Sequence, residues 1–336
     1  MRGAMQTATI APQTPTLPPF TALVAAWNEG ENLEAHIRSF RALRWPGAQL
    51  VLCAGGEDGT YQRALALADE DVAVLEQKPG MGKQRALREA LKHARHDLIF
   101  LTDADCLYDR PSLEALLKPL AEGRYQAATG GSRPLPRQAG SALAEYQGAR
   151  DLRYFDQMGP EADGLLGRNA ALTREALRQA GDLSEDVATG TDYHLAKKLR
   201  EAGIKIAYVK ESRVESEYPD TPASYLSRQR RWIKNLAVHD PRKNRPALFK
   251  SAALAALSLL GPLGLMFNLN GFTALLCAPF LLALASRYRD LIYAAKAGGA
   301  FDLKTYLAVP YFALLDQIAV LGALWDLQTP QRRTRW

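Results

Sequence analysis

Two acidic side chains stand one residue apart, directly after a short apolar run. The run is Leu98–Leu101, and the acids are Asp103 and Asp105. Two carboxylates this close together do not both ionise cheaply unless a cation shares them. Mg²⁺ and Mn²⁺ take one or two carboxylates and complete their coordination with water and substrate phosphates. The pattern therefore favours a divalent-metal site that serves a phosphate-bearing substrate, although a polar turn after a strand would show the same residues.

Apolar runs and helical patterns alternate from Phe20 onward. The predicted strands are Thr21–Ala26, Gln49–Ala54, Val72–Glu76 and Leu98–Leu101, and the helical patterns between them include a helix opened by Asn28–Leu33 and a helix over Gly82–His96. Strands separated in this way imply βαβ units and a doubly wound, mostly parallel sheet of the α/β class. Ligands bind beyond the carboxyl ends of such strands, which is where the acid pair falls.

The middle of the chain is less regular. It predicts a strand at Gln126–Gly130, a helix at Ala142–Gln157, a loop or strand at Gly164–Arg174, a helix opened by Thr189–His194 and stopped by Gly203, and a late strand at Ile204–Val209.

Charge and cysteine content narrow the class of protein. The net charge is +6, and the excess is concentrated just before the apolar C-terminal third, at Arg228, Arg230, Arg231, Lys234, Arg242, Lys243, Arg245 and Lys250. Basic clusters beside apolar spans are typical of anionic lipid surfaces, so we expect membrane lipids and no nucleic acid as partner. The three scattered cysteines form no disulfide framework and indicate a reducing compartment. Residues 1–18, rich in Thr, Pro and Ala, predict a disordered tail.

The C-terminal third predicts a membrane region. Ser251–Ser286 contains 36 residues and no charged side chain, which exceeds the ~20 residues that one helix needs to cross a bilayer. Asn268, Asn270 and Gly271 lie near its middle as turn residues, so two antiparallel membrane helices are expected. Tyr306–Trp325 is a third apolar span, interrupted by Asp316 and Gln317.

Two questions about this region stay open. Asp316 fits either a substrate path or an interhelical hydrogen bond. A hairpin keeps the basic segments on both of its sides in the cytoplasm, but a third full span would place Arg332, Arg333 and Arg335 outside, against the positive-inside rule. Either the third segment is re-entrant or interfacial, or the rule fails at the tail.

Five short motifs, taken in their order along the chain, resemble those of a known enzyme family. They are Val24–Glu29 (VAAWNE), Gly80–Leu87 (GMGKQRAL), Asp103–Asp105 (DAD), Gly190–Leu195 (GTDYHL) and Arg228–Trp232 (RQRRW). Together they resemble the family 2 glycosyltransferases of GT-A fold, especially membrane-bound members similar to ceramide glucosyltransferase or to processive polysaccharide synthases. The resemblance covers roughly Phe20 to the C-terminus. It implies a nucleoside-diphosphate sugar donor and a Mg²⁺ or Mn²⁺ cofactor.

The resemblance also implies roles for individual residues. Asp105, with Asp103 beside it, would hold the metal, and Asp192 would be the catalytic base. The nucleotide-binding residues implied are Ala25, Asn28, Glu29, Asp58, Lys83 and Asp103. The acceptor or donor site would contain Thr191, Tyr193, Gln229, Arg231 and Trp232.

Elementary chemistry agrees with these roles. A metal stabilises the charge that develops on the departing diphosphate. An acceptor hydroxyl has a very high pKa, so a carboxylate must take its proton during attack. Asp192, at the start of a helix, would be aimed by that helix and favoured as an anion by the helix dipole, although a helix-capping residue would look the same. One base without a covalent nucleophile implies a single displacement with inversion.

Two departures from the family pattern stand out. The loop Cys53–Asp58 lacks the acid pair that usually reads the base at the end of the second strand, which weakens the inference to uridine. Thr191 replaces the glutamate that precedes the base in the family.

The function expected is transfer of a hexose, with UDP the favoured carrier, to a lipid acceptor. The alternatives are a processive polysaccharide synthase of chitin or hyaluronan type, with a glycan acceptor, and a non-catalytic membrane scaffold. The expected organisation is a tail (1–18), a GT-A domain (19–222), an amphipathic interfacial segment (223–249), a membrane region of two to three helices (250–328) and a basic tail (329–336). The expected location is a bacterial-type cytoplasmic membrane, multi-pass, with the catalytic domain in the cytoplasm, and homo-oligomers are possible.

Overall fold

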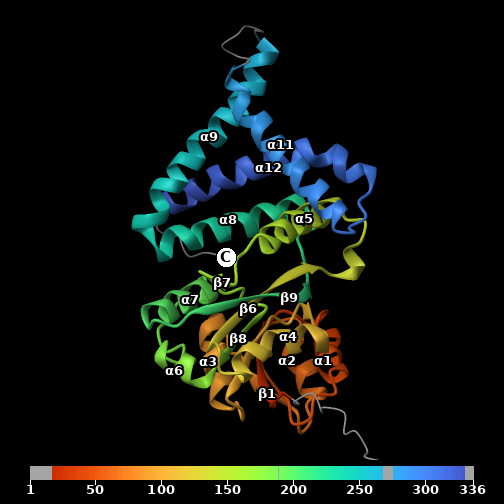
Figure 1. Cartoon of the computed structure of the whole chain (residues 1–336), viewed down its shortest axis with the longest axis vertical. Coiled ribbons are helices and arrows are strands. Elements are labelled where there is room, and N and C mark those ends of the chain that lie inside the picture. Colours follow the sequence, from red (N-terminus) through yellow and green to blue (C-terminus); the bar gives the residue numbers. More distant parts are fainter. Residues whose placement is uncertain (1–16, 188, 268–274, 330–336) are drawn as a thin grey trace, which may run out of the picture.

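The computed structural model describes residues 17–187, 189–267 and 275–329 of the chain. Within these residues one mixed sheet of nine strands forms the centre of the N-terminal part (Figure 1). The strands are β1 (Phe20–Trp27), β2 (Gln49–Gly55), β3 (Val72–Glu76), β4 (Leu98–Leu101), β5 (Cys106–Leu107), β6 (Ala127–Pro134), β7 (Glu161–Ala162), β8 (Ala170–Thr173) and β9 (Ile206–Ser216). Their order is β3-β2-β1-β4-β8-β6-β9-β5, with β7 also paired to β9.

The helices lie on both faces of this sheet and in a separate C-terminal group. Those of the sheet region are α1 (Leu33–Ala42), α2 (Thr60–Ala66), α3 (Gly82–Lys92), α4 (Arg110–Ala121), the short 3₁₀ helix η1 (Pro136–Gln138), α5 (Ala142–Asp156), α6 (Arg174–Gln179) and α7 (Thr191–Glu201). The C-terminal group consists of α8 (Pro222–His239), α9 (Pro241–Phe267), α11 (Ala278–Lys296) and α12 (Leu303–Gln328).

The expected α/β class and the mostly parallel strands at the N-terminus are confirmed. β1 pairs in parallel with β2 and β4, and β2 pairs in parallel with β3. The next strand across, β8, runs antiparallel to both β4 and β6. The sheet is therefore parallel and doubly wound over β3, β2, β1 and β4, and mixed from β8 onward.

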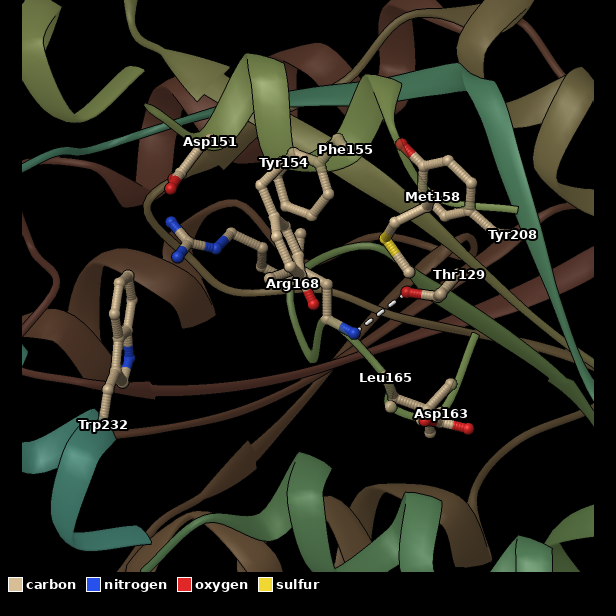
Figure 2. Close-up of a pocket in the computed structure, with 13 residues that line it drawn as sticks. Thr129, Asp151, Tyr154, Phe155, Met158, Asp163, Leu165, Arg168, Tyr208 and Trp232 are labelled. Carbon is tan, nitrogen blue, oxygen red and sulfur yellow. Dashed lines mark hydrogen bonds between the residues drawn. The ribbon is translucent and has the colours of Figure 1, made fainter. Parts of the chain in front are cut away.

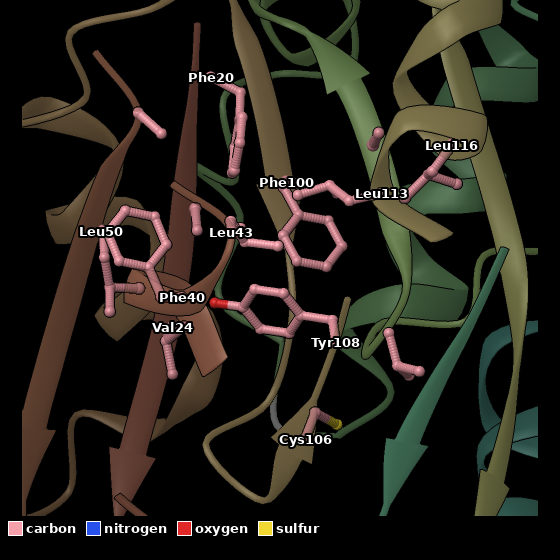
Figure 3. Packing of buried hydrophobic residues seen from close by; sticks show 14 of the residues in the cluster. Phe20, Val24, Phe40, Leu43, Leu50, Phe100, Cys106, Tyr108, Leu113 and Leu116 are labelled. Atoms are coloured by element: carbon pink, nitrogen blue, oxygen red, sulfur yellow. The ribbon is translucent and has the colours of Figure 1, made fainter. Parts of the chain in front are cut away.

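Each strand sends alternate residues to opposite faces, and each face has its own core. On one face the side chains of Phe20, Val24 and Phe100 pack with residues of α1, α2 and α4 (Figure 3). The Phe20 ring meets the Phe100 ring edge-on at 6.3 Å, and Phe100 meets Tyr108 at 5.2 Å. On the other face Leu23 and Ile99 pack against α3, α6 and α7. Apolar burial on both faces explains why these strands are short, continuous apolar runs.

Some predicted boundaries are wrong. The helix expected over Gly82–His96 ends at Lys92. The strand expected at Ile204–Val209 begins at Ile206 and extends to Ser216, because β6 supplies a parallel partner along most of that length. Most of the predicted disordered tail and of the basic tail lies outside the described residues.

The C-terminal helices form a layer and a projection (Figure 1). α8 and α12 lie along each other next to the sheet region, whereas α9 and α11 converge at the end of the molecule farthest from it. Two segments are long and apolar enough to cross a membrane by length and composition, Asn244–Gly264 and Leu303–Gln328. α11 is not one of them, since Arg287, Arg289 and Asp290 fall within it. The predicted turn residues Asn268, Asn270 and Gly271 lie outside the described residues.

Candidate active site

The acid pair lies beyond the carboxyl end of β4, as the sequence predicts. Lys83, in the first turn of α3, places its Nζ 2.5 Å from Asp103 Oδ1. Burial alone would raise the pKa of Asp103, but the Lys83 charge and hydrogen bond offset this and hold the pKa below its usual value. Burial and the neighbouring Asp103 both act on Asp105, and its pKa is raised. The two carboxylates are therefore not equivalent: Asp103 forms a direct ion pair with Lys83, and the pKa values of the two acids are shifted in opposite directions.

Asp105 is suited to an added cation. Its side chain accepts one weak hydrogen bond, from Cys106 Sγ at 3.3 Å, and the charges of Arg168 and Arg228 act on it electrostatically. No three His, Cys, Asp or Glu side chains come together as a complete metal site in residues 17–187, 189–267 and 275–329. A hard divalent ion held by one or two carboxylates takes its other ligands from substrate phosphates and water. The residues present fit such an ion.

A third acid comes from the loop after β1. Glu29 accepts a hydrogen bond from Asn32 Nδ2 at 3.0 Å, and the same amide donates to Glu217 at 3.2 Å. Burial, with the nearby charges of Asp105, Asp103 and Glu217, raises the pKa of Glu29 to about 7. Three carboxyl groups, those of Glu29, Asp103 and Asp105, therefore interact with one another at this end of the sheet.

Other predicted nucleotide residues shape the loops around this edge. Ala25 lies on β1, half-buried, beside Cys53 of β2. Asn28 adopts a positive φ of 57° and accepts a hydrogen bond from the Glu57 N–H at 2.9 Å. The Asp58 carboxylate accepts hydrogen bonds from Gly30 N at 2.9 Å and Thr60 N at 3.0 Å. These contacts tie the loops after β1 and β2 together, and a direct role of the three residues in nucleotide binding stays a prediction.

Asp192 lies in the first turn of α7. The helix N-cap is Gly190, whose φ is 68°, so Asp192 is not the N-cap residue. Its Oδ1 accepts from its neighbour Tyr193 N at 2.9 Å, and its Oδ2 has one long contact, 3.4 Å, with Gly167 N. A Cβ on Gly167 would lie 2.9 Å from that of Asp192, so the glycine permits this close approach. Thr191, beside it, is buried.

Two cations connect Asp192 with the acid pair. Lys83 interacts electrostatically with Asp103, Asp192 and Asp105, in that order of strength. Arg231 of α8 also interacts with these three acids. Burial and the charge of Arg168 lower the pKa of Arg231, and the three acids oppose that shift. The end of β4, the start of α7 and the middle of α8 therefore lie close together in the structure and form the candidate active site, as the motif order predicts.

The remaining predicted site residues lie on α7 and α8. Gln229 and Trp232 lie on α8 with Arg231. The Tyr193 ring stacks on His239 at 5.4 Å, and its hydroxyl accepts from Asn244 Nδ2 at 3.3 Å. Through these two contacts Tyr193 connects α7 with the junction of α8 and α9.

Arg168 is a site residue that the sequence does not single out. It is 9% exposed, its Nη1 donates to Ser216 Oγ at 2.8 Å, and its guanidinium lies 5.8 Å from the Trp232 ring centroid and 5.7 Å from that of Tyr218. It also interacts electrostatically with Asp105 and Asp103. A charged residue between Gly167 and an apolar run is the only local signal of it.

Arg168 and Trp232 also border a cavity of ≈ 270 Å³ beneath α5 (Figure 2). Asp151 faces Arg168 from α5 and accepts from Tyr218 OH at 2.7 Å. The rest of the lining is largely apolar, and includes Tyr154, Phe155, Met158, Leu165, Leu166 and Tyr208. The cavity is large enough for a sugar ring or a short apolar chain, and lies on the Trp232 side of the site.

Comparisons with known proteins agree with the geometry. Residues 18–235 match the family model described as "Glycosyltransferase like family 2". The chain is 20% identical to glycosyltransferase AglE of Haloferax volcanii, over 74% of this chain and 82% of AglE. It is 21% identical to poly-beta-1,6-N-acetyl-D-glucosamine synthase of Staphylococcus aureus, over 64% of this chain and 53% of the synthase, and so spans about half of that relative's length.

A solved structure shares the fold. Mannosyltransferase PcManGT from Pyrobaculum calidifontis, in complex with GDP-Man and Mn²⁺, aligns over 97% of this chain and 91% of its own at a TM-score of 0.59 and 21% identity. This likeness shows the GT-A arrangement that the motifs imply. Since the family model covers well over half of the chain, the protein is a glycosyltransferase that belongs to family 2.

Proposed function

We propose that this glycosyltransferase transfers a hexose from a nucleoside-diphosphate sugar to a hydroxyl group of a membrane lipid, with inversion and with the help of a divalent metal. The observation that carries the proposal is the position of Lys83 and Arg231, which interact with both the acid pair and Asp192. A diphosphate between these cations would leave its sugar next to Asp192, whose Oδ2 has one long contact, 3.4 Å, with Gly167 N.

The donor side is assigned as follows. Asp105, with Asp103 beside it, would hold Mg²⁺ or Mn²⁺, which when bound supplies positive charge to the diphosphate. Lys83 and Arg231 add charge-assisted hydrogen bonds to the phosphates, and Arg suits them because its fork matches two phosphate oxygens at once. The resemblance favours UDP, whereas the similar solved structure contains GDP-Man and Mn²⁺, so both bases belong in any test.

The acceptor side uses Asp192 as base. As the acceptor oxygen attacks the anomeric carbon, its proton passes to the Asp192 carboxylate. The bond between the anomeric carbon and the donor phosphate oxygen breaks, and its electron pair leaves with the diphosphate. Lys83, Arg231 and Arg168 stabilise that leaving charge, and Trp232 gives the acceptor a flat apolar face.

A lipid acceptor is supported by the surface of the C-terminal helices. Large apolar side chains are exposed along α9 and the segment around α11, at Leu254, Leu257, Leu260, Leu263, Leu275, Leu281 and Leu282. A continuous apolar surface of this kind is typical of contact with a bilayer. Trp232 of α8 borders the cavity at the site, and α8 leads into these segments, so a lipid headgroup would reach the site from the membrane. We place the catalytic domain at the cytoplasmic face, where nucleotide sugars and reduced cysteines are found together.

A processive polysaccharide synthase is the second candidate. It is favoured by the similarity to poly-beta-1,6-N-acetyl-D-glucosamine synthase and by the aromatic lining of the cavity beside Trp232, which suits a sugar ring. In that case the acceptor is the growing glycan, and the cavity holds the ring that precedes the acceptor hydroxyl.

The test is product formation in membranes that contain the protein, with radiolabelled UDP- and GDP-sugars and either Mg²⁺ or Mn²⁺. Label that enters organic-extractable lipid supports the lipid transferase, and label in a high-molecular-weight, glycosidase-sensitive product would establish the polymer synthase. Asp192→Asn should lower turnover by about 10²–10⁴-fold, the range for loss of a general base. Asp186→Asn, which removes a surface carboxylate paired with Arg85, is the matched control. No transfer from any donor by the wild-type protein would overturn the proposal and favour a scaffold.

A further inference from the structure

Helix α12 is hydrogen-bonded to the catalytic domain at the middle of its length. Asp316, at the middle of the helix, is buried and accepts four hydrogen bonds. The donors are Arg150 Nη1 at 2.9 Å and Tyr146 OH at 2.7 Å from α5, Tyr225 OH at 2.5 Å from α8, and Arg287 Nε at 2.9 Å from α11. Three of these four partners belong to α5 and α8, which pack on the sheet region. The question that the sequence leaves open at Asp316 is thus answered by interhelical bonding.

The two ends of α12 are held in the same way. Near its start, Thr305 Oγ1 donates to Glu145 Oε2 of α5 at 2.5 Å. Near its end, Asp326 lies 3.6 Å from Lys234 of α8, a buried pair. Between them Gly322 lies against Arg230, since a Cβ there would come within 2.1 Å of the guanidinium. One face of α12 therefore rests on the catalytic domain from its first turn to its last.

The opposite face of α12 is apolar and exposed. It consists of Leu303, Leu307, Tyr311, Ile318 and Trp325, with exposed fractions of 38–72%. At 100° per residue these five positions fall within about 80° of the helix circumference. The stripe runs along the whole helix, on the side turned away from Thr305, Asp316 and Asp326.

The other apolar segment is short for a pair of full spans. The uncharged stretch Ser251–Ser286 has 36 residues, so its two arms average at most 18 residues. The candidate span Asn244–Gly264 reaches 21 residues only because it includes Arg245 and Lys250. Eighteen helical residues measure about 27 Å, and part of that length must connect the arms, whereas the hydrocarbon core is about 30 Å thick. Exposed cations flank both arms on the domain side, namely Arg242, Arg245, Lys250, Arg289 and Lys296, and these suit anionic headgroups.

We propose that the protein binds an anionic bilayer from one side only: α9 and α11 enter it as a hairpin, and α12 lies along its surface as an interfacial helix clamped to the catalytic domain. This inference rests on the membrane association that is part of the proposed function. It replaces the third membrane span expected from Tyr306–Trp325. It also removes the conflict with the positive-inside rule, because α12 then does not carry the chain across the bilayer.

The test is labelling of single cysteines by a membrane-impermeant maleimide, in sealed vesicles of either orientation. Lys304→Cys and Gln328→Cys mark the two ends of α12, and Arg38→Cys marks the catalytic domain, all at exposed positions. The wild-type chain, whose three cysteines are buried, gives the background. We expect all three variants to react from the same side. Reaction of Lys304→Cys and Gln328→Cys from opposite sides would show that α12 crosses the bilayer and would overturn the proposal.

Two companion measurements separate this inference from the proposed function. The full chain should float with vesicles of anionic phospholipid, and failure to float would overturn membrane association itself. A spin label at Ile318→Cys, in the exposed stripe of α12, should be accessible to a water-soluble nickel reagent, whereas the same label at Leu260→Cys of α9 should be accessible to oxygen only. A label at Ile318→Cys as deep as the one at Leu260→Cys would contradict an interfacial helix even if the protein floats and is active.

Discussion

The ammonium group of Lys83 lies 2.5 Å from Asp103 Oδ1, where the start of α3 meets the end of β4. This ion pair gives the two neighbouring acids, Asp103 and Asp105, different electrostatic surroundings. Asp103 is paired with Lys83, and Asp105 is the acid that we propose as the ligand of a cation that arrives with the substrate. The same ammonium also interacts with Asp192, so one side chain links the proposed metal site to the proposed base.

We therefore expect Lys83→Met to lower kcat/KM for the donor by roughly 10²-fold, as for loss of one preorganised charge at a developing anion. Without the ammonium, Asp103 and Asp105 compete for the same cation, so the Mn²⁺ concentration needed for half-maximal rate should also change. Initial rates over a Mn²⁺ titration measure both effects. Lys78→Met, an exposed lysine just before the same motif, is the control, and equal kinetics for the two variants would contradict the assignment.

We expect Arg168 to contribute to turnover as much as the residues of the recognised motifs do. Arg168→Met keeps the length of the side chain but removes the charge that faces Trp232, Tyr218 and Asp105, and we expect a fall in turnover of at least about 10-fold. Arg168→Lys should not restore the rate, because a compact ammonium cannot face two rings and bond Ser216 at once. Rates of the two variants against Arg178→Met, which removes an exposed arginine paired with Glu175, check this. A fully active lysine variant would mean that charge alone matters.

The first half of the fold is predictable because its signals are local. β1, β2 and β4 are apolar runs buried on both faces, and the acids that follow β4 fall at the sheet edge where parallel strands end. β8 is different. Its four residues become a strand only because β4 and β6, distant in sequence, present backbone groups on either side.

The residues that the sequence does not predict, such as Arg168, reach their positions through contacts between segments that are distant in the sequence. Arg168 precedes β8 and enters the site because β8 is inserted between β4 and β6. Asp316 has partners on three other helices, which no periodicity within α12 reveals. The basic cluster is likewise only partly a lipid-facing surface, because Lys234 is buried against Asp326. By contrast Asp103, Asp105, Asp192 and Trp232 lie in short motifs, and motif order alone brings them to the right elements.

Asp316→Asn tests how much the clamp on α12 contributes to stability. The change keeps the size of the side chain but leaves Arg150 and Arg287 without their shared carboxylate, and breaking a buried pair in this way costs about 3–5 kcal/mol. We expect a lower midpoint of thermal unfolding in detergent, followed by loss of activity. Asp302→Asn, at an exposed acid paired with Lys304 just before α12, should leave the midpoint nearly unchanged. Equal midpoints for both variants would mean that α12 is held by apolar packing alone.

His36 should make the fold sensitive to mild acid. Its Nδ1–H donates to the Cys106 carbonyl at 2.8 Å, and its Nε2 is buried without a hydrogen-bond partner in the described structure. Burial lowers the pKa of His36 from 6.5 to about 4. Between these two values the unfolded chain binds a proton that the folded chain does not, so the free energy of unfolding falls as the pH is lowered through this window. The fall is at most about 3 kcal/mol.

His36→Asn removes this titration while it keeps an amide near the position of Nδ1. The variant is expected to be less stable at pH 7.5, because the ring no longer packs edge-on against Tyr108 at 5.4 Å, but its stability should fall less between pH 6.5 and pH 4. Urea unfolding of the full chain over this pH range measures the two slopes. His93→Asn, at an exposed histidine, should keep the wild-type slope. Parallel curves for the wild type and His36→Asn would show that other groups cause the acid sensitivity, and that the neutral imidazole beneath the Asp103–Asp105 turn does not.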